Sequence, residues 1–174
     1  MDAVGVASQE RASAAWSKGW FKNSVVPIRL GDQDPILDSD ELVRQNVTVE
    51  HLAKLAPAFE QIGKDYRQYI RFRYPQISSI HHVHHAGNSS GIADGAAIVL
   101  MGNPTIGEEL GLKPKAKIVA TASAGDDPCI MLTAPAAAAR KALDRAGLGM
   151  GDIDLFEVNE AFASVVLYLS LIHI

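Results

Sequence analysis

The sequence predicts an α/β fold in which helices cover the faces of a layered sheet. The second half of the chain alternates short β-branched segments with helical ones, an order typical of layered α/β proteins. Ala96–Met101 is a short apolar run of the kind found in strands buried on both faces. Pro135–Ala146 is rich in alanine, begins with proline and is followed by Gly147, which predicts a helix with a glycine cap.

Composition limits the classes of protein that this chain can belong to. Its 174 residues are 48% hydrophobic and carry a net charge of -4, which is ordinary for a globular protein and gives no strong field for nucleic acid. A single cysteine excludes an internal disulfide framework and suits a reducing compartment, so we expect a cytoplasmic location. No apolar run approaches the roughly 20 residues of a membrane helix, and no signal peptide opens the chain.

The first 60 residues predict two helices, a strand and a loop. Helical spacing of small and apolar residues covers 2–18, and Gly19 is a plausible stop. Val25–Leu30 is β-branched and bounded by turn residues, which indicates a strand. The acidic segment 31–41 reads as a solvated loop. Thr48 is placed to cap a second helix that Pro57 limits.

Residues 61–75 interleave basic and aromatic side chains. That pattern can serve single-stranded nucleic acid, in which case binding would weaken with salt. The alternative is a surface segment whose arginine stems lie along the protein. The acidic total charge favours the surface segment.

The rest of the chain completes the alternation of strand and helix. Strands are predicted at Ile77–Val83, Ala116–Ala122 and Asp152–Val158. A helix is predicted over Pro104–Leu112, and another from Glu160 onward.

Four histidines surround Val83 and raise the question of a metal. His82 and His84 would share one face of a strand, and paired imidazoles can ligate zinc. Further ligands are missing nearby, so a polar strand edge or the lining of a substrate cleft is the preferred interpretation, and no metal is expected.

Cys129 is the only thiol. Asp126 and Asp127 beside it would disfavour a thiolate, so we expect a buried structural cysteine rather than a nucleophile. The glycine-rich segment 147–151 follows a helix and precedes a strand, which is the wrong order for a dinucleotide loop and indicates a helix stop.

Asn159 stands where a predicted strand ends and a helix begins. Functional groups gather at that place in α/β sheets. Asparagine is also a favoured capping residue, and on the residues alone a simple N-cap is the better account of Asn159.

Two segments, Ala86–Gly91 and Asn159–Ala163, resemble signature segments of the thiolases, coenzyme A enzymes that make or break a carbon–carbon bond beside a thioester. Ser8–Ala12 and Leu52–Phe59 are similar to that family's loop domain. By this resemblance, 1–85 is a coenzyme A-binding loop domain, 86–113 ends the N-terminal half, and 114–167 opens the C-terminal half. The tail 168–174 reads as foreign sequence. His82–His84 is most similar to actinobacterial acetyl-CoA acyltransferases.

The resemblance implies a fold and an activity. It implies part of a five-layered αβαβα fold with a loop domain. The implied reaction is acyl transfer between an acyl-enzyme and coenzyme A or acetyl-CoA, in fatty acid metabolism. Acyl-CoA and coenzyme A would be substrates, with no separate cofactor, and the parent enzyme would be a homodimer or homotetramer. The resemblance implies no binding to nucleic acid and no association with a membrane.

The resemblance also assigns roles to residues. Asn159 matches the family asparagine that holds a water in an oxyanion hole, with Ala161 and Phe162 lining the same cavity. The remaining matches contact coenzyme A or the acyl chain: Leu55, Ala58, Phe59, Ala86, Ser90 and Ile92.

The family's nucleophilic cysteine, general-base histidine and second cysteine have no counterpart among these 174 residues. We therefore expect no thiolase activity from this chain alone, and low stability from unpaired sheet edges. One alternative is a non-catalytic module that binds coenzyme A or an acyl group. Another keeps the fold but shifts toward sterol-carrier thiolase-like proteins or ketoacyl synthases. Asn159–Phe162 argues against this second alternative, because those proteins carry histidine there.

Overall fold

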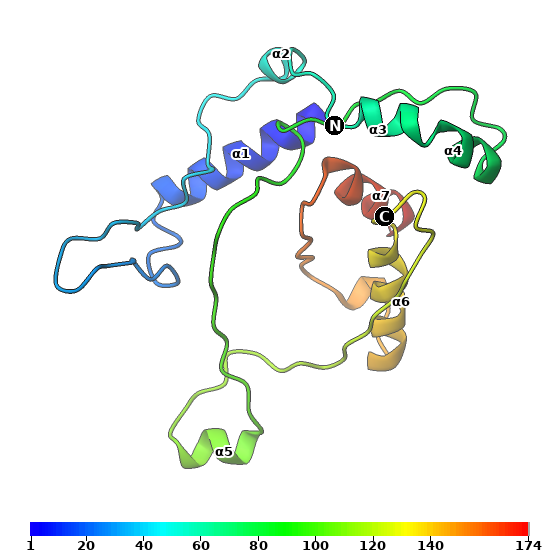
Figure 1. Cartoon of the computed structure of the whole chain (residues 1–174). Helices are drawn as coiled ribbons and strands as arrows, with labels where there is room; N and C mark the ends of the chain where they lie inside the picture. Colours follow the sequence, from blue (N-terminus) through cyan, green and yellow to red (C-terminus); the bar gives the residue numbers. More distant parts are fainter. Residues whose placement is uncertain (174) are drawn as a thin grey trace. The chain divides into compact units, whose positions relative to one another are not determined.

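The computed structural model describes the backbone of residues 1–173 and the side chains of residues 1–170. The described part divides into two compact units. Figure 1 labels the helices along the chain. Unit 1 comprises Met1–Gly91 and Asn159–Leu167, and unit 2 comprises Ile92–Val158 and Tyr168–Ile174.

Unit 1 opens with the helix α1, Asp2–Ser17, as the spacing of its small residues predicts. The chain leaves the helix through Gly19, whose φ of 69° is in the left-handed region that glycine adopts at no steric cost. The short helix α2, Val49–Leu52, packs against α1. The hydroxyl oxygen of Thr48 accepts a hydrogen bond from the His51 N–H at 3.2 Å, which confirms the predicted cap.

The basic and aromatic segment forms two further short helices of unit 1. These are α3, Glu60–Asp65, and α4, Arg67–Arg73, separated at Tyr66. Phe72 on α4 is 86% exposed. The segment therefore lies on the surface of the described chain, as its preferred interpretation holds.

Unit 2 contains α5, Pro104–Glu109, then α6, Ala134–Ala146, and the 3₁₀ turn η1, Met150–Asp152. The Asn103 side chain caps α5 by accepting the Ile106 N–H at 2.9 Å. Gly147 ends α6 with φ 67° and ψ 30°, so the predicted glycine cap is confirmed. A last helix, α7, spans Ala163–His173 and begins in unit 1.

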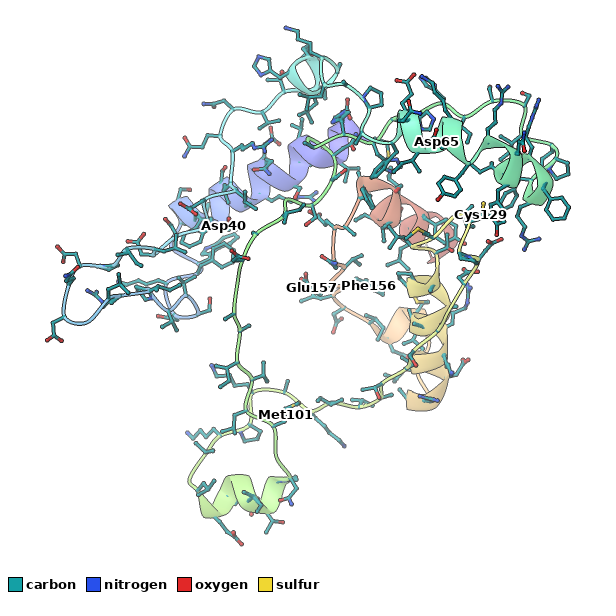
Figure 2. All side chains as sticks on the ribbon, viewed as in Figure 1. Asp40, Asp65, Met101, Cys129, Phe156 and Glu157 are labelled. Atoms are coloured by element: carbon teal, nitrogen blue, oxygen red, sulfur yellow. The ribbon has the colours of Figure 1, made fainter. Side chains whose placement is uncertain are left out.

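The predicted strands are wrong as paired strands. Among residues 1–173 only two isolated antiparallel bridges form, Ile28 with Leu37 and Ser89 with Phe162. Ala96–Met101 and Ala116–Ala122 run extended without a ladder in this part of the chain (Figure 2, near the labelled Met101). A strand is defined by hydrogen bonds to a neighbour, which its own residues do not supply.

The last helix begins later than predicted. α7 starts at Ala163 rather than Glu160, and Asn159 is therefore not its N-cap. Residues 161–163 instead exchange backbone hydrogen bonds with 88–90, which keeps the preceding backbone extended. A long-range pairing has overridden the local helical tendency.

Buried apolar side chains are few among the residues described. Unit 1 buries Ala15, Leu52, Ala163 and Val165, whereas unit 2 buries Ala136. No helix in the described part is both long and apolar enough to cross a membrane.

Candidate functional site

The two motifs that sequence analysis singled out lie side by side in unit 1. Ser89 and Phe162 form an antiparallel bridge. On one side of it the Ser90 N–H donates to the Ala161 carbonyl at 2.9 Å, and on the other the Ala163 N–H donates to the Asn88 carbonyl at 2.9 Å. We call this arrangement the motif pairing. It fixes Ala161 and Phe162 against the Ala86–Gly91 segment.

Asn88 holds the Ala86–Gly91 segment in shape from within. Its side chain is 3% exposed. Its Oδ1 accepts the His85 N–H at 3.1 Å, and its Nδ2 donates to the Val83 carbonyl at 2.9 Å. The Asn88 N–H donates to the His85 carbonyl at 3.1 Å, and the Ser89 hydroxyl donates to the same oxygen at 2.9 Å. A buried amide with these partners defines one conformation of the turn.

His85, the second buried polar residue, is oriented by two neighbours. The Gly87 N–H donates to His85 Nδ1 at 3.1 Å, so that nitrogen carries the lone pair. A ring proton is then on Nε2, which lies 3.1 Å from Asp2 Oδ1. Asn88 Nδ2 donates to the same carboxylate oxygen at 2.8 Å. The 3.2 Å approach of Asn88 Nδ2 to His85 Nε2 therefore joins two donors that share one acceptor.

Three rings gather beside the motif pairing. Phe162 lies edge-on to His84 at a centroid distance of 5.1 Å and to Phe59 at 5.8 Å, and Phe59 lies edge-on to His84 at 6.3 Å. Edge-to-face contacts of this kind stabilise aromatic pairs beyond the area they bury. The Ala58 N–H donates to the His84 carbonyl at 2.8 Å, which places Phe59 next to the ring of His84.

His84 adds a polar atom to this aromatic cluster. Its Nε2 lies 2.9 Å from the hydroxyl oxygen of Ser164, in the first turn of α7. Burial lowers the pKa of His84, and the neighbouring His85 lowers it further. The shift favours the neutral imidazole, which can donate or accept one hydrogen bond at Nε2.

Most of the predicted site residues fall within unit 1. Phe59 and Phe162 are in contact, Ser90 and Ala161 share a hydrogen bond, and Leu55 lies over Gly87, where a side chain would meet its methyl group. Ala58 binds the His84 backbone, as described above.

The other three predicted residues have no such contacts. Ala86 is exposed between His85 and Gly87. Asn159 is also exposed, and its side chain makes no hydrogen bond within the described residues. Its neighbour Glu160 accepts a hydrogen bond from the Ser8 hydroxyl on α1. Ile92 belongs to unit 2 and is fully exposed.

Sequence reasoning missed Ser164 and Asp2. It noted His84 and His85 only as members of a histidine cluster. The signals were present but weak: a hydroxyl directly after a motif, and an acidic residue in the first turn of a helix. Neither residue is near its partner in the sequence, so no spacing rule finds the pair.

The histidine cluster does not form a metal site in the described chain. No group of three or more histidine, cysteine, aspartate or glutamate side chains there is arranged to hold an ion. The His82 ring packs on Gly63 of α3, whereas His84 and His85 take the partners described above.

Cys129 is half-buried rather than buried, contrary to the sequence-based expectation. Its N–H donates to Asp127 Oδ1 at 2.8 Å. The interpretation of Cys129 as a non-catalytic thiol stays a prediction.

Comparison with family models finds two matches. The thiolase N-terminal domain matches residues 1–64, and the thiolase C-terminal domain matches residues 112–172. The second match extends into the tail 168–174.

Curated relatives agree with these matches. The chain is 42% identical over 166 residues to an acetyl-CoA acetyltransferase of Allochromatium vinosum, covering 94% of this chain and 37% of the relative. It is 40% identical to a 3-ketoacyl-CoA thiolase of Citrobacter koseri, covering 95% of this chain and 39% of the relative. The rat peroxisomal 3-ketoacyl-CoA thiolase B is 41% identical, with 96% and 37% covered. The likeness to actinobacterial members stays a prediction.

A solved structure supports the same fold. The crystal structure of the Bacillus anthracis acetyl-CoA acetyltransferase matches with a TM-score of 0.80 and 34% identity, covering 98% of this chain and 39% of that one. The fold is thus the thiolase fold, and the chain spans a little over a third of the length of the relatives that it matches. Both thiolase domain models, the relatives and the structure agree, and the chain belongs to the thiolase family.

Proposed function

We propose that this chain is part of a thiolase that transfers an acyl group between an enzyme thioester and coenzyme A or acetyl-CoA. The reaction would be thiolysis of a 3-ketoacyl-CoA or formation of acetoacetyl-CoA. The observation that supports it best is the motif pairing, which sets Phe162 and Ala161 against Ser90 and brings Phe59 into the same cluster.

Within this proposal each residue has a task. Leu55, Phe59 and Phe162 offer apolar surface to the pantetheine arm or the acyl chain, which excludes water from the thioester. Ser90 offers polar contacts to the same arm. Asn159 holds a water that stabilises the negative charge developing on the thioester oxygen, an effect that is usually a large part of catalysis.

The remaining contacts follow the same scheme. Ala58, Ala86, Ala161 and Ile92 complete the lining of the coenzyme A site. Coenzyme A and its thioesters act as substrates, so no separate cofactor or metal is proposed. The division into a loop domain at 1–85, the end of one half at 86–113 and the start of the other at 114–167 belongs to the proposal. So do a homodimer or homotetramer and a cytoplasmic location.

The chain by itself is proposed to bind but not to turn over its substrate. A thiolase needs a cysteine thiolate that takes the acyl group and a second acid–base group that moves the proton. The only thiol here is Cys129, next to two aspartates and with its own N–H bound to Asp127. No acid–base partner for this thiol is among the contacts described.

The test is calorimetric titration of the purified 174-residue chain with coenzyme A. Binding is expected, and Phe59→Ala or Phe162→Ala should weaken it about tenfold, because each removes a large apolar contact. Phe72→Ala is the matched control, since that ring is 86% exposed on α4 and should leave binding unchanged. Equal affinity in all four proteins would refute the proposed site.

A second measurement addresses turnover. Acetoacetyl-CoA and free coenzyme A are mixed with the chain, and loss of the enolate absorbance is followed. No cleavage above the rate without protein is expected. Cleavage that survives Cys129→Ser but is lost in Asn159→Ala would show that the chain is catalytic after all.

A non-catalytic protein that binds coenzyme A is the second candidate. The half-buried Cys129, with an aspartate on its backbone, is the observation that favours it. Reading the parent gene past both ends separates the two. A cysteine-containing segment before Met1, with a histidine and a second cysteine after the tail, would support the enzyme. A frame confined to these residues would support the binding protein.

A further inference from the structure

One carboxylate oxygen of α1 collects two donors from the motif segment. Asp2 is the first residue of α1, and its side chain is 22% exposed. Its Oδ1 receives Asn88 Nδ2 at 2.8 Å and faces His85 Nε2 at 3.1 Å. Hydrogen bonds to a charged acceptor are stronger than neutral ones, and here both donors are buried.

Water cannot take the place of Asp2 as the acceptor for these two donors, because His85 is 6% exposed and Asn88 is 3% exposed. The second N–H of the Asn88 amide is already bound to the Val83 carbonyl. A neutral amide oxygen in place of the carboxylate would accept both buried hydrogen bonds more weakly, which would loosen the turn that they hold.

The hydrogen bond from the Gly87 N–H determines which nitrogen of the His85 ring can donate to Asp2. It fixes the lone pair of His85 on Nδ1, which puts the ring proton on the side of Asp2. The Gly87 N–H, the imidazole of His85, the carboxylate of Asp2 and the amide of Asn88 are thus connected through successive hydrogen bonds. Such a chain holds the backbone more firmly than its separate members would.

Asn88 connects these hydrogen bonds to the candidate site through its backbone. Its carbonyl accepts the Ala163 N–H, and two residues later the Ser90 N–H binds the Ala161 carbonyl. Any shift of Asn88 moves both bonds of the motif pairing. Ala161 and Phe162 lie between those bonds, and Asn159 lies just before them.

We propose that Asp2 is a positioning residue which, through His85 and Asn88, holds the motif pairing in the register that the candidate site requires. Its consequence for coenzyme A rests on the proposed function. Its consequence for the motif pairing does not, because that pairing is a property of unit 1 alone.

The test compares Asp2→Asn with wild type by amide hydrogen exchange of the 174-residue chain. The amides of Ser90 and Ala163 report on the motif pairing, and the amide of Lys18, bonded to the Ala14 carbonyl, reports on α1. Asp2→Asn should speed exchange at Ser90 and Ala163 about tenfold and leave Lys18 within twofold. Asp32→Asn, which removes the same charge from an exposed loop, should change none of the three.

The exchange rates distinguish a positioning role of Asp2 from general stabilisation of unit 1. Unchanged exchange at Ser90 and Ala163 overturns the proposal. Equal acceleration at Lys18 also overturns it, because Asp2 would then only stabilise the unit as a whole. If Asp2→Asn does not fold, the long-range nitrogen spectrum of the wild-type His85 ring decides: a proton on Nε2 supports the proposal, and a neutral ring protonated on Nδ1 refutes it.

Coenzyme A titration of the same two variants tests the dependent part. If wild type binds, Asp2→Asn should weaken binding about tenfold while Asp32→Asn does not. If wild type does not bind but the exchange pattern appears, the proposed function fails and the positioning role remains. Weaker exchange protection with unchanged affinity would overturn the link between Asp2 and the site.

Discussion

The Nε2 atom of His84 lies 2.9 Å from the hydroxyl oxygen of Ser164, a residue far away in the sequence. The contact joins the end of the histidine cluster to the first turn of α7. Because the His84 ring also packs edge-on against Phe59 and Phe162, one polar interaction and two aromatic ones meet on a single side chain. A change in the charge of this ring should therefore alter the stability of unit 1.

Acid should destabilise unit 1 through His84. Burial lowers the pKa of this ring below its ordinary value of 6.5, so the unfolded chain takes up the proton at a higher pH than the folded chain does. The contribution to stability is fully present above pH 6.5 and is lost as the pH falls through the lowered pKa of the folded state. Urea midpoints measured on either side of pH 6.5 should differ more in wild type than in His84→Gln. His81→Gln, at an exposed neighbour, should keep the wild-type difference.

The hydrogen bond between His84 and Ser164 should be visible in a double-mutant cycle. His84→Ala and Ser164→Ala are each expected to destabilise unit 1, and together by less than the sum, with a coupling of about 0.5 to 1.5 kcal/mol. Urea unfolding of the four proteins measures it. A cycle of His81→Ala with Ser164→Ala should give no coupling, since His81 is exposed and has no described contact with Ser164. Additive effects in the first cycle would contradict the contact.

Gly147→Ala should destabilise the end of α6. Gly147 has φ 67°, a conformation that costs an alanine about 1 kcal/mol. Exchange of the Leu148 amide, which donates to the Leu143 carbonyl, should become faster. Gly151→Ala is the matched control, because its φ is not positive and nothing lies within reach of an added methyl group. The idea fails if both substitutions have the same effect.

Two glycines of the α5 region should respond in opposite directions to alanine. Gly107 is inside the helix, and an added methyl group would meet only ordinary contact with the Leu112 carbonyl, so Gly107→Ala should stabilise α5 by about 0.5 to 1 kcal/mol. Gly111 follows the helix with φ 65°, so Gly111→Ala should destabilise it. Exchange of the Leu110 amide, bonded to the Ile106 carbonyl, measures both. Equal signs would show that α5 is not formed in solution.

The features that could be predicted from sequence are the local ones. α1, α6, the cap at Thr48 and the glycine after α6 each depend on residues within a few positions, and all four are present. Strand pairing depends on a partner elsewhere in the chain, so a segment such as Ala116–Ala122 has the composition of a strand without forming one within the described residues.

At the candidate site, too, the contacts between residues far apart in the sequence were the ones that could not be predicted. The resemblance pointed to Phe59 and Phe162, which are in contact. The hydrogen bonds of His84 with Ser164 and of Asn88 with Asp2 join residues that no motif places together, and only the folded chain brings them close. The predicted start of the last helix at Glu160 was wrong for the same reason, because the competing partner of 161–163 lies at 88–90.

The bridge between Ser89 and Phe162 can form only after most of the chain has been synthesised. Everything between these two residues, including all of α5 and α6, is made before Phe162 emerges. Until then the Ala86–Gly91 segment has no backbone partner for its Ser90 N–H or its Asn88 carbonyl. Each doubling of the intervening stretch adds about 0.6 kcal/mol to the entropic cost of closing it. The pairing that orders the Ala86–Gly91 segment is therefore among the last contacts of unit 1 that the growing chain can make.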